Sequence, residues 1–159
     1  MGKIAFVFAG QGAQYTGMGQ SVYQSSPAAK ALLDTAESLR EGTLKQCFTA
    51  PKEELSLTIN AQPCLMAVGC ACAAALLETG IKPDGLAGFS LGEIAALGFS
   101  GIIGFEQAFK LVMKRAAFMH ACAREHPGGM AAVLKLSDEQ AEALCEAHGA
   151  YPVNYNCPG

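Results

Sequence analysis

A serine between two glycines is the residue of this chain best suited to covalent chemistry. Gly88-Phe89-Ser90-Leu91-Gly92 follows a short apolar run and precedes a stretch typical of a helix. In a strand, turn and helix of this kind, the sharp turn strains the serine backbone and presents its hydroxyl, while the small residues on either side let strand and helix pack closely. The pattern predicts a nucleophile at Ser90. The alternative is an ordinary serine that caps a helix.

Backbone N–H groups that could stabilise an oxyanion lie at two places. The N–H of Leu91 opens the helix after Ser90, and a helix N-terminus favours negative charge. Gly10-Gln11-Gly12-Ala13-Gln14 follows the first predicted strand, where a second N–H could face the same oxyanion. Phosphate binding is the competing interpretation. However, a dinucleotide fingerprint would need glycine at Tyr15, and a P-loop would need Lys followed by Ser or Thr at Met18-Gly19.

Arg115 is the candidate for recognising a carboxylate. On a helical wheel of residues 105–124, it borders an apolar stripe that includes Ala108, Val112 and Met119. A guanidinium fork aimed into a cleft there would bind a carboxylate through two parallel hydrogen bonds. The ordinary alternative is an arginine that lies along the apolar surface and reaches water.

Short buried strands and amphipathic helices must position these groups, and their order predicts the α/β fold class. Strands suited to burial on both faces of a parallel sheet are expected at residues 3–8 and 86–89. Serine or asparagine followed by proline marks two helix starts. We expect helices from Ser26-Pro27 to about Arg40, from Asn60 and Pro63 to about Gly80, over 91–99 and over 105–124.

Pro127-Gly128-Gly129 marks a predicted boundary that divides the chain into residues 1–126 and 127–159. Beyond it, we expect a strand at 130–136, a helix at 137–148 and a strand at 151–155. Ser137 would cap that helix, with Gln140 at the capping-box position. The sequence reaches Cys157-Pro158-Gly159 with this second part only begun.

Composition and charge argue against several classes of partner. Eleven Lys and Arg against fourteen Asp and Glu give a net charge of -3, with no basic stripe for a nucleic acid. The longest apolar run, residues 67–77, is shorter than the roughly 20 residues of a membrane span, and residues 4–8 are too few for a signal sequence. We therefore expect a globular, cytoplasmic protein with neither nucleic acid nor membrane as partner.

The seven cysteines do not form a recognisable metal or disulfide pattern. Their number is odd, none belongs to a C-x-x-C pair, and Cys70 and Cys72 would point in different directions from one helix. We expect free thiols in a reducing compartment and no metal site.

Four segments together resemble the malonyl-CoA:acyl carrier protein transacylase family: GQGAQ, GFSLGE followed by IAAL, MKRAAFM, and PVNYNCPG. The likeness covers essentially all 159 residues in order and spacing. It implies a larger α/β-hydrolase-like subdomain, of which residues 1–126 would be the front part. Residues 127–159 would be the first strand, helix and strand of a small ferredoxin-like subdomain inserted into it.

The resemblance also implies an activity. A malonyl group would pass from coenzyme A to Ser90, forming a malonyl-serine ester, and then to the pantetheine thiol of acyl carrier protein, with no metal or redox cofactor. The backbone amides of Gln11 and Leu91 would form the oxyanion hole, and Arg115 would hold the free malonyl carboxylate. Asn154 and Asn156 match a segment near the thioester-bearing arm of the carrier.

Two departures from the family pattern bear on this activity. Phe89 replaces the histidine that usually precedes the nucleophile, which would alter serine orientation or pH response. The family's base histidine corresponds to no residue here, and His120, His126 and His148 are expected to be ordinary polar residues. The chain alone should therefore barely turn over. We expect the front part of a transacylase, whose rear part is a complementary polypeptide, a missing segment or a truncated one.

Two other functions stay open. A serine thioesterase or hydrolase would share the Ser90 turn, but it usually has an H-G-G-type loop before the nucleophile, whereas His126-Pro127-Gly128-Gly129 comes after it. The other is a non-catalytic module that binds acyl carrier protein or coenzyme A, or that assembles with a second chain. Whether the pathway is fatty acid or polyketide synthesis is also open.

Overall fold

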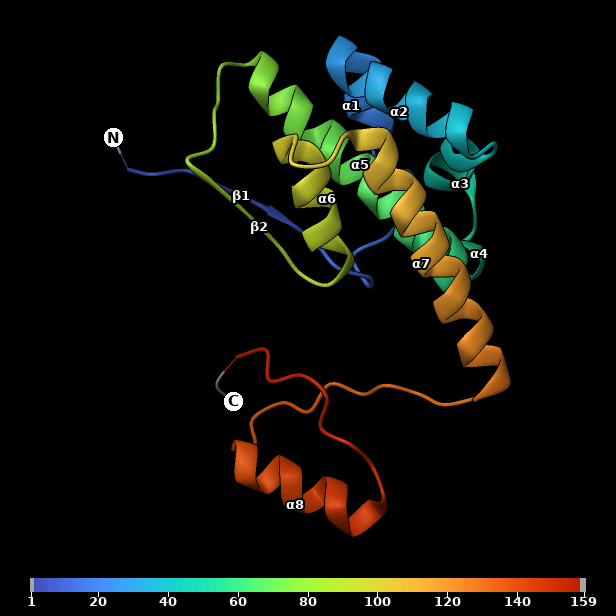
Figure 1. The fold of residues 1–159 in the computed structure, drawn as a ribbon, viewed down its shortest axis with the longest axis vertical. Coiled ribbons are helices and arrows are strands. Elements are labelled where there is room, and N and C mark those ends of the chain that lie inside the picture. Colours follow the sequence, from blue (N-terminus) through green and yellow to red (C-terminus); the bar gives the residue numbers. More distant parts are fainter. Residues whose placement is uncertain (1, 158–159) are drawn as a thin grey trace. The chain divides into compact units, whose positions relative to one another are not determined.

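The computed structural model describes residues 2–157 and divides the chain into two compact units, Met1–His126 and Pro127–Gly159 (Figure 1). Pro158 and Gly159, which end the last of the four family-like segments, lie outside the described residues. The first unit combines a two-stranded parallel sheet with helices, so the predicted α/β fold class is confirmed. Its elements are β1 Ala5–Phe8, α1 Gln20–Ser25, α2 Pro27–Leu39, α3 Thr43–Thr49, α4 Lys52–Leu55, α5 Thr58–Glu78, β2 Gly85–Gly88, α6 Leu91–Ser100 and α7 Phe105–Glu125.

The two strands lie side by side although about 80 residues separate them. Their register pairs Ala5 with Gly85 and Phe8 with Gly88, and the Phe89 N–H extends it by donating to the Phe8 carbonyl at 3.0 Å. The expectation of strands buried on both faces is wrong. Phe6 and Phe8 are buried whereas Val7 is 74% exposed, because the helices of the first unit cover only one face of β1.

Helix α5 is the central helix of the first unit and packs against α2, α6 and α7. It begins at Thr58, before the predicted start, because the Leu57 carbonyl already accepts the Asn60 and Ala61 N–H groups. The Asn60 side chain therefore does not cap it but binds Arg40 Nη2 and the Glu54 carbonyl. Pro63 lies inside the helix. Length and a mean hydropathy of 1.5 would allow α5 to cross a membrane, but 61% of that stretch is buried inside the unit, as expected for a core helix.

Helices α2, α6 and α7 follow the predicted ranges closely. The Ser26 side chain caps α2 by accepting the Ala29 N–H at 3.0 Å, with Pro27 in the first turn as expected. On α7, Ala108, Val112 and Ala116 are fully buried, whereas Met119 is 43% exposed. The buried stripe of α7 thus ends one turn earlier than the helical wheel indicated.

The second unit contains one helix, α8 Asp138–His148, within its described residues. Its predicted capping box is confirmed: Ser137 Oγ accepts the Gln140 N–H, and Gln140 Oε1 accepts the Ser137 N–H. The predicted strands at 130–136 and 151–155 are wrong, because neither segment pairs with a neighbouring backbone in the described structure. Both are largely exposed, and Lys135 has a positive φ of 66°. Apolar composition alone does not make a strand without a hydrogen-bonded partner.

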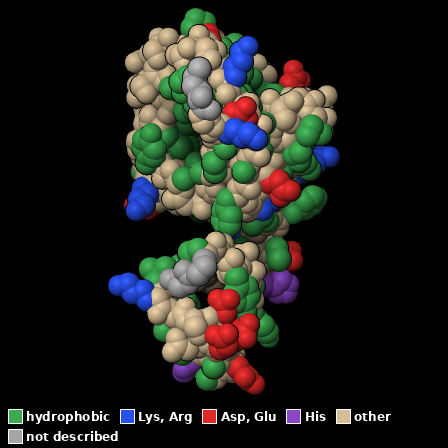
Figure 2. All heavy atoms as spheres, turned by 90° about the vertical axis from the view of Figure 1, so that its left-hand side faces the viewer, with side chains coloured by type: hydrophobic (Ala, Val, Ile, Leu, Met, Phe, Trp, Pro, Cys, Tyr) green, Lys and Arg blue, Asp and Glu red, His purple; other side chains and the backbone are tan. Residues whose placement is uncertain are grey.

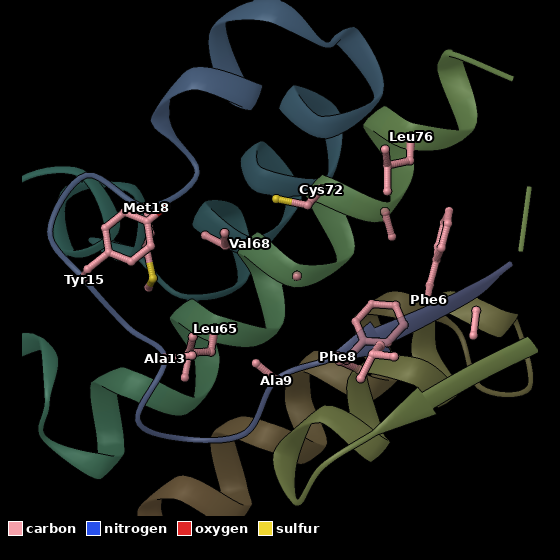
Figure 3. A pocket seen from close by; sticks show the side chains of 15 residues that line it. Phe6, Phe8, Ala9, Ala13, Tyr15, Met18, Leu65, Val68, Cys72 and Leu76 are labelled. Atoms are coloured by element: carbon pink, nitrogen blue, oxygen red, sulfur yellow. The ribbon is translucent and has the colours of Figure 1, made fainter. Parts of the chain in front are cut away.

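A hollow of about 360 Å³ lies between β1 and α5 in the first unit. Figure 3 shows Phe6 and Phe8 on β1, Leu65, Val68 and Cys72 on α5, and Tyr15 and Met18 on the connecting segment around this space. Figure 2, which looks onto the first unit from the side of its strands, shows hydrophobic side chains between scattered charged ones. The hollow is apolar, and neither Ser90 nor Arg115 lines it.

Candidate active site

Ser90 stands at the turn between β2 and α6 with φ 54° and ψ -113°, a conformation that a non-glycine residue rarely adopts. Gly88 and Gly92 make this turn possible. A Cβ on Gly88 would lie 2.1 Å from the carbonyl of Gly92, and a Cβ on Gly92 would lie 2.1 Å from the Phe8 oxygen. The strained serine and the close strand–helix packing expected from the sequence are therefore both present, and the Ser90 residue is exposed.

Arg115 reaches Ser90 from α7. Its Nη2 donates to Ser90 Oγ at 3.0 Å, and its Nη1 donates to Gln62 Oε1 at 2.5 Å. The described ion pairs, Lys30–Asp34 and Lys110–Glu106, do not involve it. Within residues 2–157, the half-buried guanidinium thus carries a positive charge with no carboxylate partner, next to an exposed hydroxyl. Such a group is suited to bind an anionic substituent on a molecule that reacts at Ser90.

The loop after β1 lies against the Ser90 turn. A Cβ on Gly10 would lie 2.6 Å from the Phe89 ring, so these two residues are in direct contact. The Gln11 side chain is tied to the first residue of α5, because its Nε2 donates to Thr58 Oγ1 at 3.2 Å. Inside the loop, the Gly12 N–H donates to Gln14 Oε1 at 2.8 Å. These contacts hold the loop that carries the proposed Gln11 amide next to the nucleophile.

The start of α6 supplies the other candidate amide. The Gly92 N–H is already bonded to the Phe89 carbonyl at 2.9 Å, and the Glu93 N–H to the Ser90 carbonyl at 3.1 Å. The Leu91 N–H is the first of the helix, and a helix leaves such donors without an internal partner. The role of Leu91 and Gln11 in an oxyanion hole stays a prediction.

The remaining candidate residues lie elsewhere. Asn154 and Asn156 are exposed residues of the second unit, which is described by itself, so their proposed contact with a carrier stays a prediction. His120 is half-buried on α7 and His126 is the residue after that helix. Among the described hydrogen bonds of the Ser90 hydroxyl, the partner is Arg115 and not a histidine.

Comparison with known proteins identifies the family. The sequence profile described as "Acyl transferase domain" matches residues 5–159. The chain belongs to this family. The malonyl CoA-acyl carrier protein transacylase of Bacillus subtilis strain 168 is 41% identical over 165 aligned positions, which cover 100% of this acyltransferase chain and 52% of the relative. The resemblance expected from the sequence motifs is confirmed.

Solved structures agree with the sequence relatives. The malonyl CoA-acyl carrier protein transacylase of Clostridium perfringens matches with a TM-score of 0.87 and 37% identity, over 99% of this chain and 52% of that one. A malonyl-transacylase in complex with a type II PKS acyl-carrier protein matches with a TM-score of 0.85 and 33% identity, over 99% and 53%. The acyltransferase chain thus spans about half the length of the relatives it matches.

Sequence reasoning missed two residues that organise the site of this acyltransferase chain. Thr58 binds the Gln11 side chain, and the fully buried Gln62 binds Arg115. Both lie on α5 one turn apart, Thr58 before the predicted start of this helix and Gln62 in its predicted first turn. Their spacing of four residues, on an otherwise apolar helix, was the available signal, because residues at this spacing share a helix face.

Proposed function

We propose that the chain carries the nucleophile and the carboxylate-binding group of a malonyl transferase. The observation that carries this proposal is the Arg115 guanidinium, whose Nη2 lies 3.0 Å from Ser90 Oγ and which has no described carboxylate partner. In a malonyl thioester, a single CH₂ group separates the reacting carbonyl from the free carboxylate. A cation next to the nucleophile therefore selects that acyl group over a neutral one.

The proposed reaction has two transfers at Ser90. In the first, Ser90 Oγ forms a bond to the thioester carbonyl carbon of malonyl-CoA, the carbon–sulfur bond breaks, and the coenzyme A thiol leaves with the serine proton. In the second, the pantetheine thiol of acyl carrier protein attacks the malonyl-serine ester and restores the hydroxyl. The Gln11 and Leu91 amides would stabilise each oxyanion. This chemistry needs no metal or redox cofactor.

The base that accepts the serine proton is proposed to lie outside residues 1–159, in the part of the relatives that the chain does not span. The described partner of the Ser90 hydroxyl is a guanidinium, which only donates hydrogen bonds and stays charged. A serine without its base loses most of its rate, and removal of one triad member leaves roughly 10³ to 10⁴-fold acceleration over water. We therefore infer slow transfer by the chain alone, or malonyl-CoA binding without transfer.

Acyl carrier protein is the proposed second substrate, as one structural neighbour is a transacylase bound to its carrier protein. Asn154 and Asn156 remain our candidates for contacts with the pantetheine arm. We further propose that the first unit is the front part of an α/β-hydrolase-like subdomain and that the second belongs to a ferredoxin-like one.

A serine hydrolase acting on neutral esters is not favoured, since it has no use for the Arg115 cation and the relatives carry transacylase names.

Intact mass after incubation with malonyl-CoA tests the proposal, with imidazole added as an external base. We expect one malonyl group per chain, formed slowly and faster as imidazole is raised, because imidazole can take the proton for which the chain has no base. Ser90→Ala should abolish the adduct. The absence of any adduct at high imidazole, or its persistence in Ser90→Ala, would contradict a malonyl-serine intermediate.

A further inference from the structure

Gln62 is a fully buried amide in the apolar interior of the first unit. It lies in the second turn of α5, between the buried residues Ala61 and Pro63. A primary amide in such surroundings is costly unless its oxygen and nitrogen both find partners. Both partners come from α7: Arg115 and, one turn further along, Met119.

The chemistry of these two partners fixes the orientation of the amide. Arg115 has only donors, so the Gln62 group that faces its Nη1 must be the carbonyl oxygen, at 2.5 Å. The Gln62 Nε2 then faces Met119 Sδ at 3.2 Å, and a thioether sulfur is a weak acceptor. The reversed amide would place an N–H against the guanidinium. Gln62 therefore has one favoured orientation.

We propose that Gln62 is a positioning residue that aims Arg115 at the acyl group bound to Ser90. The guanidinium is a rigid planar fork, so a bond that anchors Nη1 to α5 also restricts where Nη2 points, which is toward Ser90 Oγ. The other N–H groups of the fork remain for a carboxylate. This inference rests on the proposed function, since it explains how the diacid would be selected.

The neutrality of Gln62 is part of the proposal. A glutamate at this position would accept the same hydrogen bond, but its charge would neutralise the guanidinium and weaken attraction to a second carboxylate. An amide anchors the arginine while leaving its charge for the ligand. The alternative is that Gln62 only fills space and satisfies hydrogen bonds in the core, in which case its replacement changes stability but not ligand preference.

Binding of malonyl-CoA and acetyl-CoA to the whole 159-residue chain separates these two roles. All variants are compared in a Ser90→Ala background, so that no acyl group is transferred, and both dissociation constants are measured by calorimetry. The preference for malonyl-CoA over acetyl-CoA should fall about tenfold or more in Gln62→Leu and in Gln62→Glu, the range expected for hydrogen bonds to charged groups. Arg115→Ala, which removes the cation, should lose the preference.

Gln46→Leu is the matched control. Gln46 Oε1 accepts from Arg40 Nη1 at 2.7 Å, so this variant breaks a glutamine–arginine contact of the same kind away from Ser90. Its ligand preference should stay within about twofold of the parent, as for substitutions that do not share partners with the site. Melting curves of all variants report folding separately from preference.

The outcomes separate the inference from the function on which it rests. A parent chain that binds both esters equally would remove the diacid-selecting function, and the role of Gln62 with it. A preference that is lost in Arg115→Ala but kept in both Gln62 variants would leave the function standing and overturn the positioning role. If Gln62→Leu does not fold, Gln62→Met takes its place, because methionine keeps the side-chain length but offers Arg115 no carbonyl acceptor.

Discussion

At the scale of single residues, the site combines a strained serine with an arginine that has no acidic partner. Ser90 has a positive φ that costs on the order of 1–3 kcal/mol for a residue with a side chain, and packing around the turn must compensate for it. Arg115 bonds to the serine hydroxyl on one side and to a neutral amide on the other. Backbone strain of this kind persists where the surrounding structure enforces it, and it is common at functional sites.

The strain at Ser90 can be measured by comparing two substitutions. Ser90→Gly should be more stable than Ser90→Ala by about 1 kcal/mol, because only glycine adopts φ 54° and ψ -113° without strain. Both variants lack the hydroxyl, so the Arg115 contact is lost equally in each. Denaturant unfolding gives the two free energies of unfolding. Equal values would show that the turn stores no strain.

Cysteine reactivity is predictable from burial. Burial raises the pKa of the Cys70 thiol to about 12, whereas Cys122 and Cys157 are exposed. Since the thiolate is the reactive form, Cys70 should resist alkylation by iodoacetamide at pH 8, and the two exposed cysteines should react first. Peptide mass mapping after short exposure checks this order. Early labelling of Cys70 in the folded chain would contradict the described core.

At the scale of elements, the N-terminal end of α5 holds both sides of the candidate site. Thr58 binds the Gln11 side chain of the loop after β1, and Gln62 binds Arg115 of α7. Segments far apart in the sequence therefore meet at one helix end. The Ser90 turn contacts the loop after β1 through Phe89, whose ring packs on Gly10. Phe89 therefore places an apolar ring against the loop that carries the proposed Gln11 amide.

The close packing of β2 on α6 predicts a contrast between two glycines of the same strand. Gly88→Ala should destabilise the chain by at least about 1–3 kcal/mol, because the new methyl group would meet the α6 backbone 2.1 Å away at Gly92. Gly85→Ala has nothing within 4 Å of its new Cβ and should be nearly neutral. Thermal unfolding of the two variants measures the difference. Similar losses at both positions would show that strand propensity, not packing, is responsible.

Local signals explain which parts of this fold could be predicted from the sequence. The Ser90 turn, the Ser26-Pro27 helix start and the Ser137–Gln140 capping box each depend on residues within a few positions, and all three are present. The failures depend on distant partners. The exposed face of β1 and the absence of strands at 130–136 reflect which segments are available to pack or pair. The Arg115–Gln62 contact joins residues 53 positions apart, so only the fold reveals it.

At the scale of the whole molecule, the two units differ in how much interior they have. Every buried side chain of the described residues belongs to the first unit, including the core residues Phe109, Leu33 and Met66. In the second unit, α8 has no buried residue and is held mainly by its capping box and by the bond from Tyr155 to Glu142. Burial of apolar surface is the main source of stability, so the first unit should supply nearly all of it.

A chain that stops at His126 tests this division. It should unfold cooperatively with a midpoint within about 3–4 °C of the 159-residue chain, the shift that corresponds to roughly 1 kcal/mol for a domain of this size. Limited proteolysis of the longer chain should first cut between residues 127 and 137, which are almost entirely exposed and have no regular hydrogen bonding.

Because Ser90, Arg115 and Gln62 all lie in the first unit, the shortened chain should also keep the preference for malonyl-CoA over acetyl-CoA. A large fall in midpoint would mean that residues 127–159 support the core. A stable short chain that has lost the preference would instead place part of the ligand site in the second unit, where Asn154 and Asn156 would be the first residues to replace.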